Sequence, residues 1–255
     1  MYKTKIDWCD SSWNPITGCL HGCDYCYARA HVKRFGFHRL SDGGIHDLRE
    51  PFEADYVERG IKKCPYPFDF DPTFHRYRLG IPASWSEPRT IFVGSMTDLF
   101  GDWVPDEWIQ EVFAACEAAP QHRYLFLTKN PQRYNELDAK GLLPERDNFW
   151  YGGTRTGVDS DREHEAAMTA NRFLSVEPIL APMERATLNA IELWGWIIVG
   201  AETGRRKNMV APGKSWIDEI AAACAETGTP IFMKESLRSL MGPDFKQEFP
   251  WEVRT

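Results

Sequence analysis

The sequence lacks any long hydrophobic run. No segment approaches the roughly 18 consecutive apolar residues that a membrane-spanning helix needs, and residues 1–8 contain no apolar stretch of the kind found in a signal peptide. No internal repeat at the period of a solenoid is present either. These absences predict a soluble, cytoplasmic protein that is built as one domain over residues 1–255 rather than as a repeat array.

The sequence also lacks an excess of positive charge. Its 30 lysines and arginines are outnumbered by 37 aspartates and glutamates, which gives a net charge of −7 at pH 7. This balance argues against a protein that coats nucleic acid by bulk electrostatics. Two local basic stretches are present, at residues 31–39 and 205–207. Such stretches are more often solvated faces than binding sites.

A second C-x2-C pair is missing as well. The seven cysteines are odd in number and nothing indicates secretion, so metal binding is a better explanation for them than a disulfide framework. Cys116 and Cys224 fall on apolar helix faces and are expected to be small core residues. Cys19, Cys23 and Cys26 instead lie together in the stretch TGCLHGCDYCY.

Three thiolates on one glycine-containing loop can converge on an inorganic centre. A structural zinc ion usually takes four protein ligands, and because no second C-x2-C pair is present, His21, Cys9 or a distant histidine would have to complete the set. An iron–sulfur cluster with three cysteine ligands leaves one iron open. Three ligands from one loop fit the cluster better.

Strands and helices alternate through most of the chain. A strand at 13–17 leads into the cysteine loop, and a helix at 27–35 follows and stops at Gly36. The remaining predicted strands span 90–93, 124–127, 149–151, 172–176, 194–199 and 230–233. The remaining predicted helices span 105–119, a segment ending near 137, 161–170 and 214–226. This alternation predicts parallel βαβ units in a barrel or a doubly wound sheet.

Residues 36–89 interrupt the alternation after the first βα unit. Glycine, proline, aspartate and aromatic residues recur there without a sustained period. We expect an irregular insertion or lid, with a short helix near 52–59. A surface excursion packed by its own aromatic residues is an equal alternative to a binding loop.

Polar or glycine residues follow nearly every predicted strand. The C-terminal strand ends are where α/β barrels and open sheets place their sites, and a barrel would bring all of them around one cavity. The candidates are Ser95, Thr97, Asp98, Thr128, Lys129, Glu177, Glu202, Arg205 and Lys234. Ordinary roles compete with each function: helix capping for Asp98, solvent exposure for Lys129 and Arg205, and buried ion pairs for Glu177 and Glu202.

The C-x3-C-x2-C spacing, with Tyr25 just before the third cysteine, resembles the signature of the radical S-adenosylmethionine (radical SAM) superfamily. Longer blocks at 13–19, 92–100, 174–178 and 198–204 look like those of a phage and bacterial family of unknown function that is linked to three-Cys-motif partner proteins and is distantly similar to spore photoproduct lyase. The chain departs from that pattern at GTRTG, residues 153–157, where Gly-Val-Ser/Thr followed by Val-Glu-Asn is expected.

The resemblance implies a partial parallel (β/α)6-type barrel that holds a 4Fe-4S cluster on Cys19, Cys23 and Cys26. S-adenosylmethionine would bind the open iron, and its reductive cleavage would give a 5′-deoxyadenosyl radical that abstracts hydrogen from the substrate. It also implies a one-electron donor of the flavodoxin or ferredoxin type, and a three-Cys-motif protein as partner. A nucleotide or a nucleic-acid component is the implied substrate class.

The resemblance also implies which part of the cofactor or substrate each candidate residue would bind. Asp98 would pair with the methionine ammonium, Thr128 and Lys129 would hold the carboxylate or ribose, and Glu177 would accept ribose hydroxyls. The full implied cofactor set is Tyr25, Ser95, Thr97, Asp98, Thr128, Lys129, Glu177 and Glu202. The substrate-side set is His75, Arg78, Arg205 and Lys234. The alternative function is a zinc- or cluster-stabilised binding module of phage origin, without catalysis.

Overall fold

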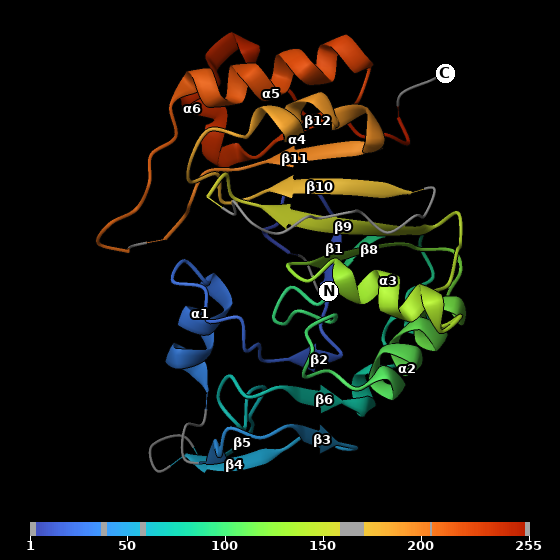
Figure 1. Ribbon diagram of the computed structural model, residues 1–255. Helices are drawn as coiled ribbons and strands as arrows, with labels where there is room; N and C mark the ends of the chain where they lie inside the picture. The colour runs from blue at the N-terminus through green and yellow to red at the C-terminus, as the bar shows by residue number, and fades with distance from the viewer. Residues whose placement is uncertain (1–3, 37–39, 57–59, 159–170, 205, 253–255) are drawn as a thin grey trace. The chain divides into compact units, whose positions relative to one another are not determined.

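The computed structural model describes residues 4–36, 40–56, 60–158, 171–204 and 206–252. They group into two compact units, Met1–Pro144 and Glu145–Thr255. The main sheet contains seven strands in the order β1-β7-β8-β9-β10-β11-β12, and its registered pairs are parallel. The predicted class, an α/β fold of the partial parallel barrel type, is confirmed (Figure 1).

The first unit contributes three strands to this sheet: β1 (Ser11–Trp13), β7 (Thr90–Val93) and β8 (Arg123–Thr128). Val93 pairs with both Trp13 and Phe126, so β1 and β7 end at the same level and β8 continues beyond them to Thr128. Helix α2 (Asp106–Glu117) follows β7, and helix α3 (Gln132–Ala139) follows β8. Cys116 is fully buried on the core face of α2, as predicted.

The strand predicted at 13–17 is wrong in its extent. It splits at Pro15, which cannot donate to a ladder, and residues Ile16–Thr17 form β2 in a different sheet. Helix α1 (Tyr27–Phe35) begins after Cys26 and ends at Gly36, as predicted. The cysteine loop therefore connects β2 of the small sheet to α1.

The insertion is more regular than predicted. Strands β3 (His46–Leu48) and β6 (Thr73–His75) join β2 in a three-stranded sheet, and β4 (Glu53–Tyr56) pairs antiparallel with β5 (Gly60–Lys63). The helix expected near 52–59 is wrong, because β4 occupies its first part. Two 3-10 turns, η2 (Arg76–Arg78) and η3 (Pro82–Ser84), complete the segment. Strands of three or four residues are too short to show a periodic pattern.

The second unit contributes β9 (Phe149–Arg155), β10 (Arg172–Val176), β11 (Trp196–Val199) and β12 (Ile231–Met233). Helix α5 (Lys214–Thr227) ends at Gly228, whose φ of 72° is the left-handed conformation that glycine adopts at helix ends. The shorter helical elements are α4 (Arg185–Asn189), η4 (Ile191–Leu193), η5 (Glu235–Leu237), α6 (Arg238–Met241) and η6 (Gly242–Asp244). The helix predicted at 161–170 lies outside the described residues.

The core of the second unit lies between α5 and one face of its strands. Leu174 and Val176 of β10 pack with Ile217 and Ile220 of α5, and Cys224 is buried there as predicted. Because side chains alternate along a strand, Phe173 and Ser175 point to the opposite face. In the part of the chain that the structure describes, no helix is both long enough and apolar enough to cross a bilayer.

Candidate functional site

The cysteine loop is fixed to the segment after β7 by its backbone. Gly18 N donates to Met96 O (2.9 Å), and Thr97 Oγ1 donates to Gly18 O (2.6 Å). Gly18 has a φ of +88°, and a Cβ at this position would lie 2.2 Å from Asp71 O. Only glycine fits this close approach, so the loop enters the site along one defined path.

The three cysteines of the loop are free thiols with partly exposed side chains. Cys26 is the N-cap of α1, and its Sγ accepts a hydrogen bond from Arg29 N at 3.3 Å. The side chain of Cys26 thus satisfies one of the free backbone amides at the start of α1. Arg29 Nη2 also donates to Cys19 O at 3.0 Å, so one residue of α1 holds both ends of the loop.

Cys19 and Cys26 pack against an apolar cluster of Ala28, Val32, Phe70 and Met96. Burial raises the pKa of the Cys19 thiol to about 12, although a backbone hydrogen bond at His21 opposes the rise. The thiol is therefore protonated at neutral pH until a cationic centre displaces its proton.

The spacing of the sulfurs bears on which inorganic centre fits the loop. A tetrahedral zinc ion with Zn–S bonds of about 2.3 Å would hold them about 3.8 Å apart. A cluster would hold its thiolates farther apart, because each binds a different iron atom. The count of three free thiols on one loop fits a cluster with one open iron better than a four-ligand zinc ion.

Asp98 is the centre of a hydrogen-bond network beneath the loop. Its Oδ1 accepts hydrogen bonds from Thr128 Oγ1 (2.7 Å) and Phe100 N (3.1 Å). Its Oδ2 accepts one from Lys129 N (2.8 Å) and lies 2.7 Å from His21 Nε2. The side chain is 7 % exposed. Both oxygens are thus engaged within the protein.

The charge of Asp98 is stabilised by these contacts. Burial opposes ionisation, but the interactions with His21, Lys129 N and Thr128 outweigh it and keep the pKa of the carboxyl below its usual value. His21 also packs edge-on against Trp103, with ring centroids 4.9 Å apart. Asp98 therefore joins the cysteine loop to the ends of β7 and β8.

The other predicted cofactor residues of the first unit surround the same loop. Ser95 Oγ donates to Asn14 Oδ1 (3.1 Å), and Ser95 O accepts a hydrogen bond from Tyr27 OH (2.5 Å). Lys129 Nζ lies 5.8 Å from the centroid of the Tyr25 ring. The structure thus brings together six of the predicted residues around the cysteine loop: Tyr25, Ser95, Thr97, Asp98, Thr128 and Lys129.

His75 and Arg78 take structural positions. His75 is fully buried, with Nε2 2.8 Å from Thr17 Oγ1 and Nδ1 3.2 Å from Tyr77 OH. Burial, aided by the charge of Arg78, lowers the pKa of His75 to about 2, so its ring is neutral. Arg78 donates hydrogen bonds to Asn14 O (3.0 Å) and Pro65 O (3.3 Å). It therefore connects the residue that follows β1 to the insertion.

The second unit holds the remaining predicted residues. Glu177, just after β10, forms an ion pair with Lys234, just after β12. Glu202 binds Arg206 through two hydrogen bonds of 2.7 and 2.8 Å and accepts a third from Val210 N. The hydrogen bonds from Arg206 keep the pKa of Glu202 below its usual value. Arg205 lies outside the described residues.

The sequence indicated His21 only as a possible zinc ligand, and its contact with Asp98 was not predicted. Two further residues at these sites escaped the sequence predictions. Ser175 and Thr154 are register partners on β10 and β9, and their buried hydroxyls have no hydrogen-bond partner among the described residues. Their signal was a polar residue inside an otherwise apolar strand. Such unpaired buried hydroxyls are uncommon and call for an explanation.

The fold is similar to that of spore photoproduct lyase. A structure of a Cys→Ala mutant of that enzyme with dinucleoside spore photoproduct matches with a TM-score of 0.51 and 11% identity, covering 90% of this chain and 79% of the other. A structure of the Cys→Ala mutant alone matches with a TM-score of 0.50, at the same identity and coverage. These likenesses concern the fold alone.

A comparison with curated proteins gave no significant match. A protein-family comparison matched residues 3–238, nearly the whole chain, to a family described as "Protein of unknown function (DUF5131)". By the extent of this match, the chain belongs to the DUF5131 family.

Proposed function

We propose that this protein is a radical SAM enzyme. The observation that carries the proposal is the cysteine loop itself: three free, partly exposed thiols held by backbone hydrogen bonds at the C-terminal ends of parallel strands. Cys19, Cys23 and Cys26 would hold a 4Fe-4S cluster. With S-adenosylmethionine bound, that cluster supplies the electron for reductive cleavage and hence a hydrogen-abstracting 5′-deoxyadenosyl radical.

In this proposal Asp98 has two roles. Both of its oxygens are already engaged by His21, Thr128, Phe100 N and Lys129 N. These contacts fix the loop, beside which Asp98 would pair with the methionine ammonium. Tyr25, Ser95 and Lys129, which are less buried than Asp98, are also placed to contact a ligand.

In the second unit, Ser175 and Thr154 offer two hydroxyls to a polar ligand. A ligand that pairs with them removes the cost of two buried, unsatisfied groups. The ion pair of Glu177 and Lys234 lies just beyond the ends of β10 and β12. In this proposal the carboxylate of Glu177 is a hydrogen-bond acceptor for a polar ligand of the second unit.

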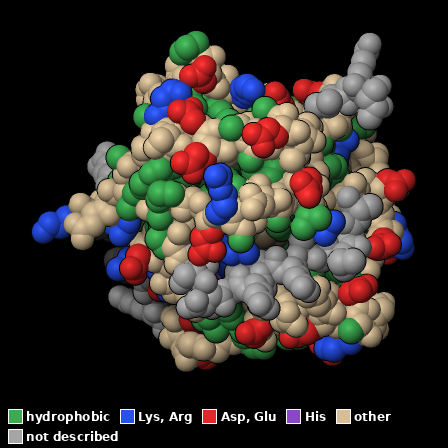
Figure 2. All heavy atoms as spheres, turned by 45° about the horizontal axis from the view of Figure 1, so that its top comes forward, with side chains coloured by type: hydrophobic (Ala, Val, Ile, Leu, Met, Phe, Trp, Pro, Cys, Tyr) green, Lys and Arg blue, Asp and Glu red, His purple; other side chains and the backbone are tan. Residues whose placement is uncertain are grey.

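A nucleotide or a short nucleic-acid component is the proposed substrate class. Support comes from spore photoproduct lyase, which has this fold and binds a dinucleoside photoproduct. The net charge of −7 opposes tight binding of a long duplex. On the face drawn in Figure 2, acidic and basic side chains are interspersed and form no single-sign patch.

The test is cluster-dependent formation of 5′-deoxyadenosine. The full chain is loaded anaerobically with iron and sulfide and then given dithionite and S-adenosylmethionine. Dithionite stands in for a donor of the flavodoxin or ferredoxin type. We expect close to four irons per chain for one 4Fe-4S cluster, and release of 5′-deoxyadenosine.

Two variants make the test specific. Cys23→Ser is expected to abolish both iron binding and 5′-deoxyadenosine release, whereas Cys9→Ser, outside the motif, should leave both intact. If the cluster-loaded protein releases no 5′-deoxyadenosine, the enzymatic proposal fails and a structural or redox-sensing cluster is favoured. If the anaerobically purified protein contains zinc instead of iron, the binding-module alternative is favoured.

A further inference from the structure

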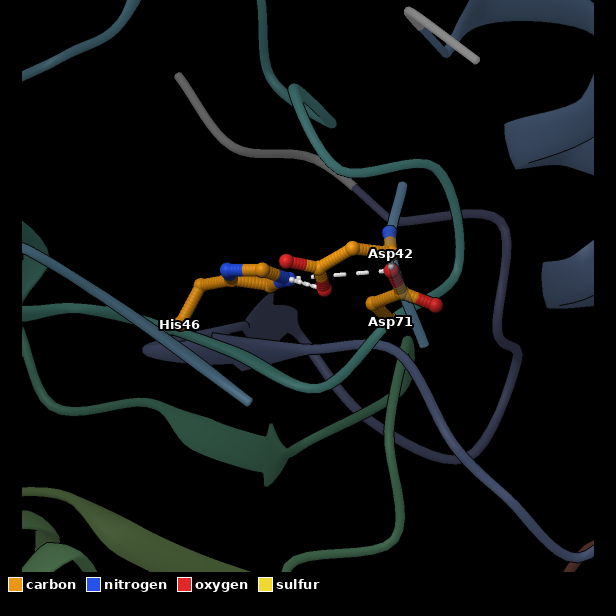
Figure 3. A group of neighbouring side chains, drawn as sticks. All are labelled: Asp42, His46 and Asp71. Atoms are coloured by element: carbon orange, nitrogen blue, oxygen red, sulfur yellow. Dashed lines mark hydrogen bonds and ion pairs between the residues drawn. The ribbon is translucent and has the colours of Figure 1, made fainter. Parts of the chain in front are cut away.

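A second group of metal-binding side chains lies in the insertion, on residues that the proposed function does not use. Asp42, His46 and Asp71 each point a ligand atom toward a common point (Figure 3). Among the described residues, this is the group of three whose ligand atoms all lie within 4.8 Å of one another. We propose that it binds a divalent transition-metal ion of the zinc class.

The distances fit an ion better than direct hydrogen bonds. His46 Nε2 lies 3.3 Å from Asp42 Oδ1 and 3.6 Å from Asp71 Oδ2. In a tetrahedral site with ligand bonds of about 2.0–2.2 Å, two donor atoms lie about 3.3–3.6 Å apart. Imidazole and carboxylate are also the nitrogen and oxygen ligands that zinc takes in proteins.

A buried nitrogen without a hydrogen bond provides the second observation. His46 Nε2 has no hydrogen-bond partner among the described residues, although two carboxylate oxygens lie within ion-pair distance of it. The ring is held in place by stacking on Phe68, with centroids 3.7 Å apart and planes 9° from parallel. In this orientation Nε2 of the ring points toward the two carboxylates (Figure 3).

The carboxylates are oriented by the surrounding backbone. Asp71 Oδ2 accepts hydrogen bonds from Ser41 Oγ (2.8 Å), Asp42 N (3.0 Å) and Gly43 N (3.0 Å). Asp42 Oδ1 accepts one from Gly44 N at 2.8 Å. Metal-binding carboxylates are usually oriented by hydrogen bonds of this kind. The Asp42 side chain is 69% exposed, which leaves room for solvent to complete the coordination.

The position of Asp71 gives the site a role. The backbone oxygen of Asp71 lies against Gly18, and the preceding Phe70 O accepts a hydrogen bond from Cys19 N. An ion at Asp71 would therefore tie residues 41–46 of the insertion to the segment that supports the cysteine loop. The bound ion would therefore have a structural role, and the site does not include the three thiols.

The test must separate this site from the thiols, which also bind zinc. Zinc chloride is titrated calorimetrically into the full chain carrying Cys19→Ser, Cys23→Ser and Cys26→Ser. We expect one zinc per chain. Adding His46→Gln should weaken binding at least about tenfold, because removing even an outer-shell partner of a metal site has an effect of this size. Glu50→Gln, an exposed carboxylate nearby, is the matched control and should leave binding unchanged.

If the triple variant does not fold, cobalt chloride titrated into the wild-type chain gives the same information. We expect one bound cobalt without thiolate-to-metal charge-transfer absorption, and its loss in His46→Gln. Absence of zinc binding in the folded triple variant, binding unaffected by His46→Gln, or thiolate absorption from every bound cobalt would each overturn the proposal.

Discussion

Asp98 is a buried carboxylate whose hydrogen bonds connect several segments of the candidate site. It accepts hydrogen bonds from two backbone amides and one hydroxyl and pairs with His21 of the cysteine loop. Each contact is strengthened by the negative charge. Residues from three separate segments therefore depend on one ionised side chain.

Replacing Asp98 tests that dependence. Asp98→Asn keeps the shape of the side chain but turns an amide NH2 group toward hydrogen-bond donors. We therefore expect the unfolding free energy to fall by about 1.5–3 kcal/mol, which is typical of a lost hydrogen bond to a charged group. Urea denaturation measures it. Asp102→Asn, an exposed carboxylate that accepts a hydrogen bond from Asn130 Nδ2, is the matched control and should change stability by less than about 1 kcal/mol. Equal effects of the two variants would contradict the central role of Asp98.

His75 predicts a pH dependence of stability. Its pKa in the folded chain is about 2, against 6.5 for the free side chain. Below pH 6.5 the unfolded chain binds a proton that the folded chain does not, so stability is complete above that pH and is lost as pH falls toward 2. The loss from this residue is about 1.4 kcal/mol per pH unit.

Urea denaturation between pH 7.5 and 4.5 measures this loss. The variant His75→Gln should show a shallower decline than the wild type, because the remaining slope comes from other groups. His31→Gln, which replaces an exposed histidine, should keep the wild-type slope. Parallel wild-type and His75→Gln curves would mean that His75 is protonated in the folded chain.

At the scale of elements, the entry to the cysteine loop depends on a glycine in a crowded, left-handed conformation. Gly18→Ala places a methyl group 2.2 Å from Asp71 O, whereas Gly22→Ala at φ +70° meets open space. The left-handed conformation costs a non-glycine residue about 1–2 kcal/mol. We expect Gly22→Ala to lose about that amount of unfolding free energy and Gly18→Ala to lose clearly more. Under the proposed function, Gly18→Ala should also retain less iron after anaerobic loading. Similar losses in both would show that the backbone at Asp71 moves aside.

Two buried serines of the sheet are predicted to change the unfolding free energy in opposite directions when each is replaced by alanine. Ser175 Oγ has no partner, whereas Ser11 Oγ accepts a hydrogen bond from Arg89. Without ligand, Ser175→Ala should raise the unfolding free energy by about 1 kcal/mol, and Ser11→Ala should lower it by a similar amount. A destabilised Ser175→Ala variant would indicate a structural hydroxyl.

At the scale of the whole molecule, charge limits the substrate. A protein that neutralises several phosphates loses affinity steeply as salt rises, with a slope of about −0.9 per phosphate. For this acidic chain we expect a slope shallower than about −3 on duplex DNA, corresponding to three or fewer phosphate contacts. Fluorescence anisotropy with a labelled duplex and a labelled dinucleotide measures it. A slope of −6 or steeper would indicate an extended nucleic-acid interface. The proposed three-Cys-motif partner could then be tested by adding it to the same assay.

The sequence by itself determined the fold class and the cysteine loop. Residues 90–93 and 172–176 were predicted with the bounds that the structure shows, because buried parallel strands are short apolar runs followed by turn residues. The helix at 27–35 was also predicted, because Gly36 marks its end. Short strands of the insertion such as β3 and β6 could not be predicted, since three residues show no period.

Only the tertiary structure decided how the candidate residues are used. The structure places Ser95 and Lys129 beside the cysteine loop. It places His75 in the insertion as a buried, neutral side chain. It also paired Asp98 with His21, 77 residues away in the chain. Local sequence carries the propensity of each strand and turn, but hydrogen-bond partners and burial arise from contacts between distant segments, and these contacts exist only once the chain has folded.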